Sequence, residues 1–339
     1  MGNSLIGIAA ALHGYAAAVH NRRDRTKEPH KKEAAMLRQL VLCSLFALGM
    51  ATQATHAAEP LPQPAWGKVE RLANVPSRYV DPRNVDVWLP PDYSAARRYK
   101  VLYMQDGQML FDARITWNQQ SWELDQAMQK LLAAGKIHNT IVVGIWSNGK
   151  YRSSEYAPQK ALPHLPEPTR AMLIDKYLAG KPRADAYLHF LVNELKPEID
   201  RRYSTLPDRD NTAIMGSSMG GLISLYAISE YPDVFGAAGC LSTHWTGTFD
   251  QNAAIPLAFF TYWQAHLPDP KTHRLYMDHG SATLDALYAP HQAFFDILAQ
   301  DKGYTAANYL SRDFPGAGHS EADWSKRVEI PLAFLLREK

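Results

Sequence analysis

A serine flanked by glycines is the residue of this sequence best placed to act as a nucleophile. Gly216, Ser218 and Gly220 form a G-x-S-x-G pattern directly after the apolar run Thr212–Met215, and a stretch with helical spacing of apolar residues follows. In such a strand–turn–helix unit the serine sits on a strained turn, and the glycines leave room for the neighbouring chain. We therefore predict that Ser218 is a nucleophile. The alternative is a glycine-rich turn that holds a buried serine.

A serine hydroxyl needs a base that takes its proton and a third group that orients this base. His319 lies at the end of a loop with two glycines, after the last predicted strand, and we predict that it is the base. For the acid we choose Asp285, which falls between Ser218 and His319 in the chain. Asp278, at the end of a predicted strand, and Asp323 are the alternatives.

An oxyanion that forms during such a reaction needs two backbone N–H donors. The residue after the nucleophile, Met219, is expected to supply one of them, and the loop after the predicted strand Lys100–Gln105 the other. We assign this second donor to the backbone N–H of Gln108. The alternative is that Asp106 and Gly107 only build a turn here.

Short apolar runs alternate with amphipathic helical patterns from Trp66 onward. This order predicts an α/β fold with a mostly parallel sheet and helices on both faces, formed by one domain over residues 59–339. Helical periodicity extends over Leu124–Leu131 and Leu188–Ile199, and a final helix is expected over Ala322–Leu336. The predicted strands are Asn84–Leu89, Lys100–Gln105, Thr140–Trp146, Thr212–Met215, Ala237–Leu241, Arg274–Met277 and Ala306–Ser311.

The proline-rich segment Ser147–Arg183 follows a predicted strand end, where ligands bind in open α/β sheets. We predict a long irregular loop that forms a lid or pocket wall, and the alternative is a surface excursion. Within it, Arg152 and Glu155 are expected to form an ion pair with each other rather than to touch substrate.

Aromatic side chains close to the predicted strand ends are candidates for substrate binding. We predict this role for Trp117, Trp146, His244 and Trp245. Since tryptophan is most often a core residue, burial in the core is the alternative for each of the three.

Several stretches of the chain resemble the esterase D/enterochelin-esterase-like family of α/β-hydrolases. They are VLYMQDGQMLFD, YRSSEYAPQ, FLVNELKPEIDRRYSTLPDRDNTAIMGSSMGGLISLYAISEYPDVFGAAGCLS, YMDHGSATLD and FPGAGHSEADW. The resemblance covers the chain from about Trp66 to its end. It implies the α/β-hydrolase fold and acyl transfer through a serine acyl-enzyme, with no metal and no organic cofactor. It places the nucleophile on Ser218, the histidine on His319 and the oxyanion donors on Gln108 and Met219.

The N-terminal region has the pattern of an export signal. Residues 36–58 run from a charged start through a short apolar stretch to small residues, as in a signal peptide, and residues 1–35 are expected to be an upstream extension. A membrane anchor over Leu5–Val19 is the alternative, and no stable membrane insertion is expected. We therefore predict a periplasmic or secreted domain. After cleavage only Cys240 would remain, which excludes an internal disulfide.

The composition excludes a nucleic-acid partner. The net charge is only +2, and residues 1–58 hold seven of the 36 Lys and Arg but three of the 34 acidic residues, so the main domain is close to neutral. The leading hypothesis is a serine carboxylic-ester hydrolase that acts on a small-molecule or glycan-linked ester. An acyltransferase with the same residues and a non-catalytic binding module on the same fold are the alternatives.

Overall fold

The computed structural model describes residues 59–337 of the chain. Residues 60–339 form one compact unit. The predicted upstream extension (1–35) and signal peptide (36–58) lie outside the described residues. Among the helices that are described, none is long and apolar enough to span a membrane.

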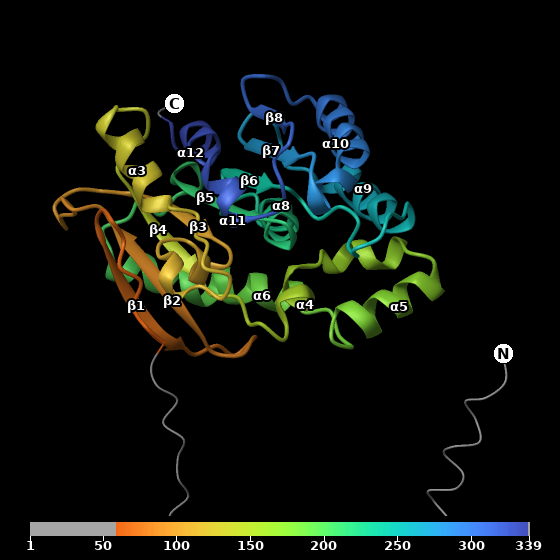
Figure 1. Cartoon of the computed structure of the whole chain (residues 1–339), viewed down its shortest axis with the longest axis horizontal. Coiled ribbons are helices and arrows are strands. Elements are labelled where there is room, and N and C mark those ends of the chain that lie inside the picture. The colour runs from red at the N-terminus through yellow and green to blue at the C-terminus, as the bar shows by residue number, and fades with distance from the viewer. Residues whose placement is uncertain (1–58, 338–339) are drawn as a thin grey trace, which may run out of the picture. The chain divides into compact units, whose positions relative to one another are not determined.

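The centre of the molecule is an eight-stranded sheet in the order β1-β2-β4-β3-β5-β6-β7-β8 (Figure 1). β1 pairs with β2 and β2 with β4 in antiparallel fashion, whereas all remaining neighbours are parallel. Parallel strands end at a common edge of the sheet, so the loops that follow them come together there. The strands are β1 (Lys68–Val75), β2 (Arg83–Leu89), β3 (Lys100–Met104), β4 (Thr140–Ile145), β5 (Thr212–Ser217), β6 (Ala237–Leu241), β7 (Arg274–Gly280) and β8 (Tyr309–Phe314).

Helices cover both faces of the sheet because its strands present apolar residues on both sides. In β3, Val101 and Tyr103 belong to one buried cluster and Leu102 and Met104 to the other. The first cluster contains residues of α4, α5, α6, α7, α8, α9 and α10, and the second those of α3, α11 and α12. The helices are α3 (Leu124–Ala133), α4 (Arg152–Tyr156), α5 (Glu167–Tyr177), α6 (Ala184–Phe190), α7 (Lys196–Arg202), α8 (Met219–Glu230), α9 (Ala254–His266), α10 (Ala289–Lys302), α11 (Glu321–Ser325) and α12 (Glu329–Leu336).

The predicted α/β sheet with helices on both sides is confirmed, with differences in the number and the bounds of the strands. β1 was not among the predicted strands, because its sequence KVERLANV mixes charged and apolar residues at an antiparallel edge. β8 begins at Tyr309 rather than at Ala306, since Thr305 and Asn308 close a turn through two hydrogen bonds.

Two predicted segments differ from the structure in their helices. The segment Ser147–Arg183 is not an irregular loop, because it contains α4 and α5; Pro168 lies in the first turn of α5, where proline is tolerated. The C-terminal helix predicted over Ala322–Leu336 is divided into α11 and α12. The break places Arg327 beside the buried Asp278.

Candidate active site

Ser218 lies on a strained turn between β5 and α8. Its φ is 58° and its ψ −125°, a conformation that non-glycine residues rarely adopt, and its N–H donates to the carbonyl oxygen of Leu241 (2.9 Å). A Cβ at Gly216 would lie 2.8 Å from the carbonyl carbon and oxygen of Gly220, so only glycine fits there. The turn leaves Ser218 partly exposed beyond the end of the strand.

His319 lies on the loop between β8 and α11 and is hydrogen-bonded to Asp285. The distance between His319 Nδ1 and Asp285 Oδ1 is 2.6 Å. Because a carboxylate accepts hydrogen bonds, this contact places a proton on Nδ1 and leaves Nε2 free to accept another. The backbone N–H of His319 donates to the hydroxyl of Thr283 (2.8 Å), which anchors the loop.

Asp285 is fully buried and stays ionised through its hydrogen bonds. Its Oδ2 accepts the N–H of Gly280 (2.6 Å) and the hydroxyl of Ser242 (2.5 Å). Burial alone would raise the pKa of Asp285, but the hydrogen bonds from His319, Ser242 and Gly280 outweigh it and lower the pKa below its usual value. A charged acceptor is therefore available to His319.

The two alternative acids have other partners. Asp278 forms a buried ion pair with Arg327 and accepts the hydroxyl of Tyr276 (2.9 Å). Asp323 accepts the backbone N–H of Gly318 and the hydroxyl of Ser320, both at 3.0 Å. Among the three candidates, Asp285 is the one that pairs with the His319 ring.

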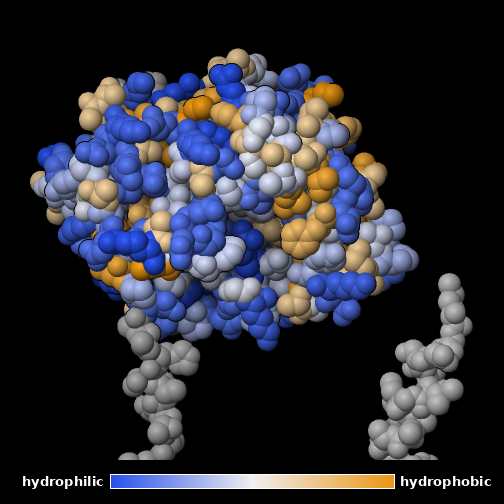
Figure 2. Space-filling view, in the orientation of Figure 1, coloured by the Kyte–Doolittle hydropathy of each residue, from blue (hydrophilic) through white to orange (hydrophobic). Residues whose placement is uncertain are grey.

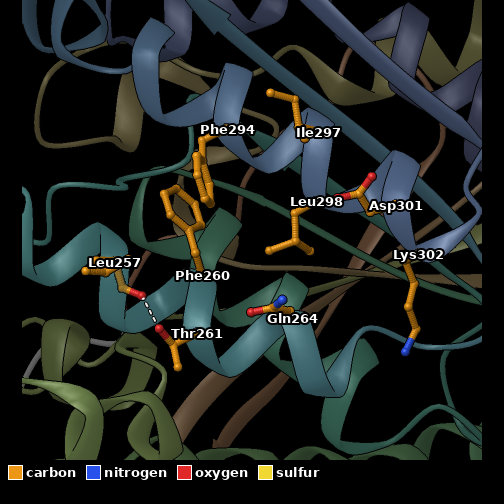
Figure 3. Close-up of a pocket in the computed structure, with 9 residues that line it drawn as sticks. All are labelled: Leu257, Phe260, Thr261, Gln264, Phe294, Ile297, Leu298, Asp301 and Lys302. Carbon is orange, nitrogen blue, oxygen red and sulfur yellow. Dashed lines mark hydrogen bonds between the residues drawn. The ribbon is translucent and has the colours of Figure 1, made fainter.

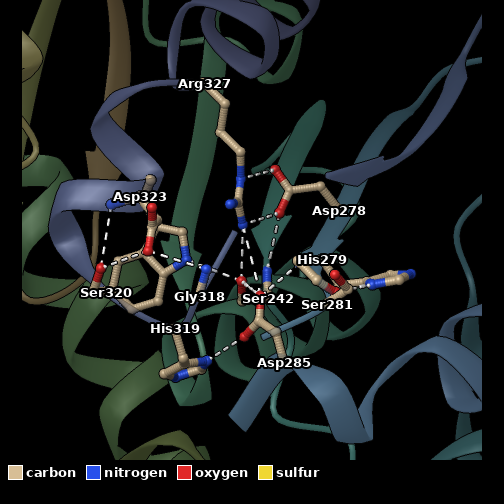
Figure 4. A network of polar contacts seen from close by, with 12 residues as sticks. Ser242, Asp278, His279, Ser281, Asp285, Gly318, His319, Ser320, Asp323 and Arg327 are labelled. Atoms are coloured by element: carbon tan, nitrogen blue, oxygen red, sulfur yellow. Dashed lines mark hydrogen bonds and ion pairs between the residues drawn. The ribbon is translucent and has the colours of Figure 1, made fainter. Parts of the chain in front are cut away.

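A polar network that sequence reasoning missed connects Asp285 to Asp278 (Figure 4). The hydroxyl of Ser242 donates to Asp285 and accepts N–H groups from Arg327 and Trp324, both at 2.9 Å. The backbone N–H of Ser242 donates to Asp278 Oδ1 (3.2 Å). Apart from the position of Ser242 just after a predicted strand, the sequence gives no signal for this network.

Ser218 and His319 line the same two cavities without a hydrogen bond between their side chains in the described part of the chain. Such contacts are commonly long in active sites without a ligand. The apolar cavity, of about 180 Å³, has walls of Leu173, Leu178, Met219, Phe249, Phe259 and Leu284, and also His244. The larger cavity, of about 560 Å³, is called the polar cavity here for its side chains of Gln108, Asn118, Gln120, Ser147 and Glu321, and its walls also include Met109, Trp117, Trp122 and Trp324.

The predicted oxyanion donors lie at helix starts next to Ser218. Met219 is the first residue of α8, and Gln108 lies in the short 3₁₀ helix Gly107–Met109. N–H groups in a first helical turn have no acceptor within their own helix and are free for a ligand. The side chain of Gln108 is fixed by Ser147, since its Nε2 donates to the Ser147 hydroxyl (2.7 Å). A Cβ at Gly107 would lie 2.3 Å from the backbone of Gly144, so this turn requires glycine.

The four predicted substrate-binding residues divide into two pairs. Trp117 lines the polar cavity with 85% of its surface exposed, and His244 lines the apolar cavity. Trp245 is fully buried against the rings of Phe260, Trp263 and Phe295, so its predicted role in binding is wrong.

Trp146 also has a different place from the one predicted. Its Nε1 donates to Asp86 (2.9 Å), and the guanidinium of Arg71 lies 4.5 Å from its ring centroid. It lines neither of the two cavities at Ser218. Through its hydrogen bond to Asp86, Trp146 connects the end of β4 with the neighbouring strand β2 and so has a structural role.

The expected ion pair between Arg152 and Glu155 is not formed. Arg152 makes two hydrogen bonds with the carboxylate of Asp106 (2.7 and 2.8 Å), and Glu155 pairs with Arg83 in the core. On the short helix α4 the two side chains therefore point to different partners. Arg152 lines both cavities and joins the segment Ser147–Arg183 to the turn that carries Gln108.

A separate apolar groove lies between α9 and α10 (Figure 3). Its volume is about 300 Å³, and the stacked rings of Phe260 and Phe294 form one end of it. Leu257, Phe294 and Ile297 are exposed here, on the side where Figure 2 shows hydrophobic residues at the surface. None of the predicted site residues lines this groove. In residues 59–337 no group of His, Cys, Asp and Glu is placed to hold a metal ion.

Comparison with known proteins assigns the chain to a family. The model of the Esterase family matches residues 77–329. The Bacillus subtilis protein YbbA is 28% identical over 201 residues, which are 59% of this chain and 68% of YbbA.

Solved structures share the fold. A ferulic acid esterase superposes with a TM-score of 0.57 at 19% identity, over 80% of this chain and 98% of its own. The enterobactin esterase of Shigella flexneri gives a TM-score of 0.59 at 19% identity, over 81% of this chain and 60% of its own. The fold and the family define a carboxylic ester hydrolase of the α/β-hydrolase fold. The chain belongs to the Esterase family, and the resemblance found in the sequence is confirmed.

Proposed function

We propose that this protein is an exported serine esterase in which Ser218, His319 and Asp285 form a catalytic triad. The observation that carries the proposal is the 2.6 Å contact between His319 and Asp285 beside a serine on a strained turn. A buried carboxylate that accepts from Nδ1 leaves Nε2 as the basic atom, which is the form needed to activate a serine.

In the first half of the reaction, the oxygen of Ser218 attacks the ester carbonyl carbon while His319 takes the hydroxyl proton. The carbonyl oxygen becomes negative and accepts from the N–H groups of Met219 and Gln108. The bond to the alcohol oxygen then breaks, and His319 gives the proton to the departing alcohol. In the second half, His319 takes a proton from water as the water oxygen attacks the acyl carbon. The bond between this carbon and the Ser218 oxygen then breaks, His319 returns the proton to Ser218, and the acid is released.

The activity is tested with Ser218→Ala and a nitrophenyl ester of a short acid. We expect kcat to fall by about 10⁴-fold or more, as for loss of other serine nucleophiles. A fluorophosphonate should label the wild type and not the variant, detected as a mass increase on the peptide that carries residue 218. Hydrolysis by the variant at the wild-type rate would rule out Ser218 as the nucleophile. A wild type that neither hydrolyses the ester nor is labelled would favour a binding module.

Export is supported by the signal-peptide pattern in residues 36–58. The full chain, expressed in a Gram-negative host, should appear in the periplasmic fraction or the medium without its leader. Mass spectrometry of the new N-terminus measures the cleavage site. Retention of an uncut chain in the cytoplasm would contradict this part of the proposal and leave the esterase part intact.

A further inference from the structure

Two cavities of different character meet at Ser218, and each suits one half of an ester. In an acyl-enzyme mechanism the alcohol leaves first, and water must then reach the acyl carbon. The polar cavity is the larger of the two, at about 560 Å³, and the exposed Trp117 lies on its rim. It therefore gives the wider route for the departing alcohol and for the incoming water. The apolar cavity, at about 180 Å³, then remains for the acyl group. This allocation rests on the proposed function.

His244 is part of the wall of the apolar cavity, close to the nucleophile. Its backbone N–H donates to the carbonyl oxygen of Ser218 (3.2 Å). Burial, together with the charges of His319 and Arg152, lowers the pKa of His244 to about 3. The ring is therefore neutral at pH 7, and only one of its nitrogens carries a proton.

Tyr288 determines which nitrogen of His244 carries this proton. The Tyr288 hydroxyl lies 2.7 Å from His244 Nδ1, and Tyr288 is fully buried. Burial raises the pKa of Tyr288, so its hydroxyl keeps its proton and needs an acceptor. Within residues 59–337, His244 Nδ1 is the hydrogen-bond partner of this hydroxyl. The hydroxyl thus donates to Nδ1, and the proton of the ring is on Nε2.

The Nε2–H group of His244 is open to the cavity. In the described part of the chain, Nε2 has no hydrogen-bond partner. It is not among the fully buried polar atoms without a partner, so Nε2 is accessible. Since Nδ1 faces the buried Tyr288, the accessible edge of the ring is the one that carries Nε2. The guanidinium of Arg152, also in this wall, is bound to Asp106.

We propose that His244 is a specificity-determining residue whose Nε2–H donates to an oxygen atom within the acyl group of the substrate. The preferred acyl groups are compact and carry a hydroxyl, ether or carbonyl oxygen. A purely alkyl group of the same size would leave this donor without an acceptor, which costs binding free energy in the transition state.

The proposal is tested with 4-nitrophenyl esters whose acyl chains have equal length: pentanoate, 3-methoxypropanoate and 2-ethoxyacetate. The measured quantity is the ratio of kcat/KM for each ether ester to that for pentanoate. The intrinsic reactivity of the esters cancels when this ratio is compared between enzymes. For at least one ether ester, we expect the ratio to fall about tenfold or more from wild type to His244→Phe. His244→Gln, which keeps an N–H donor, should restore much of it.

Tyr288→Phe provides a second route, because it removes the group that fixes the proton on Nε2 and should lower the same ratio. Unchanged ratios in His244→Phe for both ether esters overturn the proposal. If His244→Phe does not fold, the proposal is overturned by ratios of kcat/KM in Tyr288→Phe that equal those of wild type. In either case pentanoate is still hydrolysed, and the proposed function stands. A wild type that hydrolyses none of the esters and resists the fluorophosphonate instead refutes the proposed function and this inference with it.

Discussion

Asp278 and Asp285 are both fully buried near the carboxyl end of β7 and both contact Ser242, yet their closest basic partners differ. The guanidinium of Arg327 lies 2.9 Å from Asp278 and 3.9 Å from Asp285, whereas the closest basic partner of Asp285 is the imidazole of His319, at 2.6 Å. A guanidinium keeps its charge at every relevant pH, but an imidazole gains and loses a proton near neutrality. Because both carboxylates are equally buried, the basic side chain nearest to each of them decides which one suits a proton-transfer site.

The largest expected effect comes from removing the charge that faces His319. Asp285→Asn should lower kcat by about 10⁴-fold, because the amide no longer holds the imidazole in the form that activates Ser218. Steady-state kinetics with a nitrophenyl ester measures this effect. Asp323→Asn, in α11 directly after the histidine loop, is the matched control and should stay within a few-fold of wild type. A collapse of kcat in Asp323→Asn with an active Asp285→Asn would reverse the assignment of the acid.

The same change at Asp278 should affect stability rather than chemistry. Asp278→Asn removes the closer of the two buried carboxylates beside Arg327, while Asp285 Oδ2 remains 3.9 Å away, and breaking this buried ion pair costs about 3–5 kcal/mol of unfolding free energy. Urea unfolding measures the loss, and kcat of the folded fraction should change far less than in Asp285→Asn. The double variant Asp278→Leu with Arg327→Met removes both charges and should recover much of the stability. Equal stability of wild type and Asp278→Asn would mean that the ion pair contributes little.

The sequence predicted those parts of the fold and site that depend on local pattern. The turn at Ser218 could be predicted because its glycines meet a steric demand within five residues, and Ala237–Leu241 because a buried parallel strand is a continuous apolar run. Trp245 shows the limit, since its neighbours Phe260 and Phe295 come from helices that lie later in the chain. The ion pairs of Arg152 and Arg327 likewise join residues about 50 positions apart, which no local spacing specifies.

The smallest expected effect concerns Ser242, which contacts both carboxylates. Ser242→Ala removes a hydrogen bond to Asp285 and leaves N–H groups of Trp324 and Arg327 without this acceptor. We expect a loss of about 1–3 kcal/mol of unfolding free energy and a fall of about tenfold in kcat with little change in KM. A variant that is less stable but has wild-type kcat would show that the hydroxyl supports the fold alone.

The pH dependence of this stability loss separates the contact with Asp285 from the contacts with Trp324 and Arg327. The Ser242 hydroxyl helps to lower the pKa of Asp285 in the folded state. Because the pKa of Asp285 is lower in the folded than in the unfolded protein, where it is about 3.9, ionised Asp285 stabilises the fold. This stabilisation is complete above the pKa of the unfolded state and is lost as the pH falls through the pKa of the folded state. The difference between wild type and Ser242→Ala should therefore be constant above about pH 5 and shrink on acidification. A difference that stays the same down to pH 3 would assign the stability loss to the contacts of the Ser242 hydroxyl with Trp324 and Arg327, which do not involve the Asp285 carboxylate.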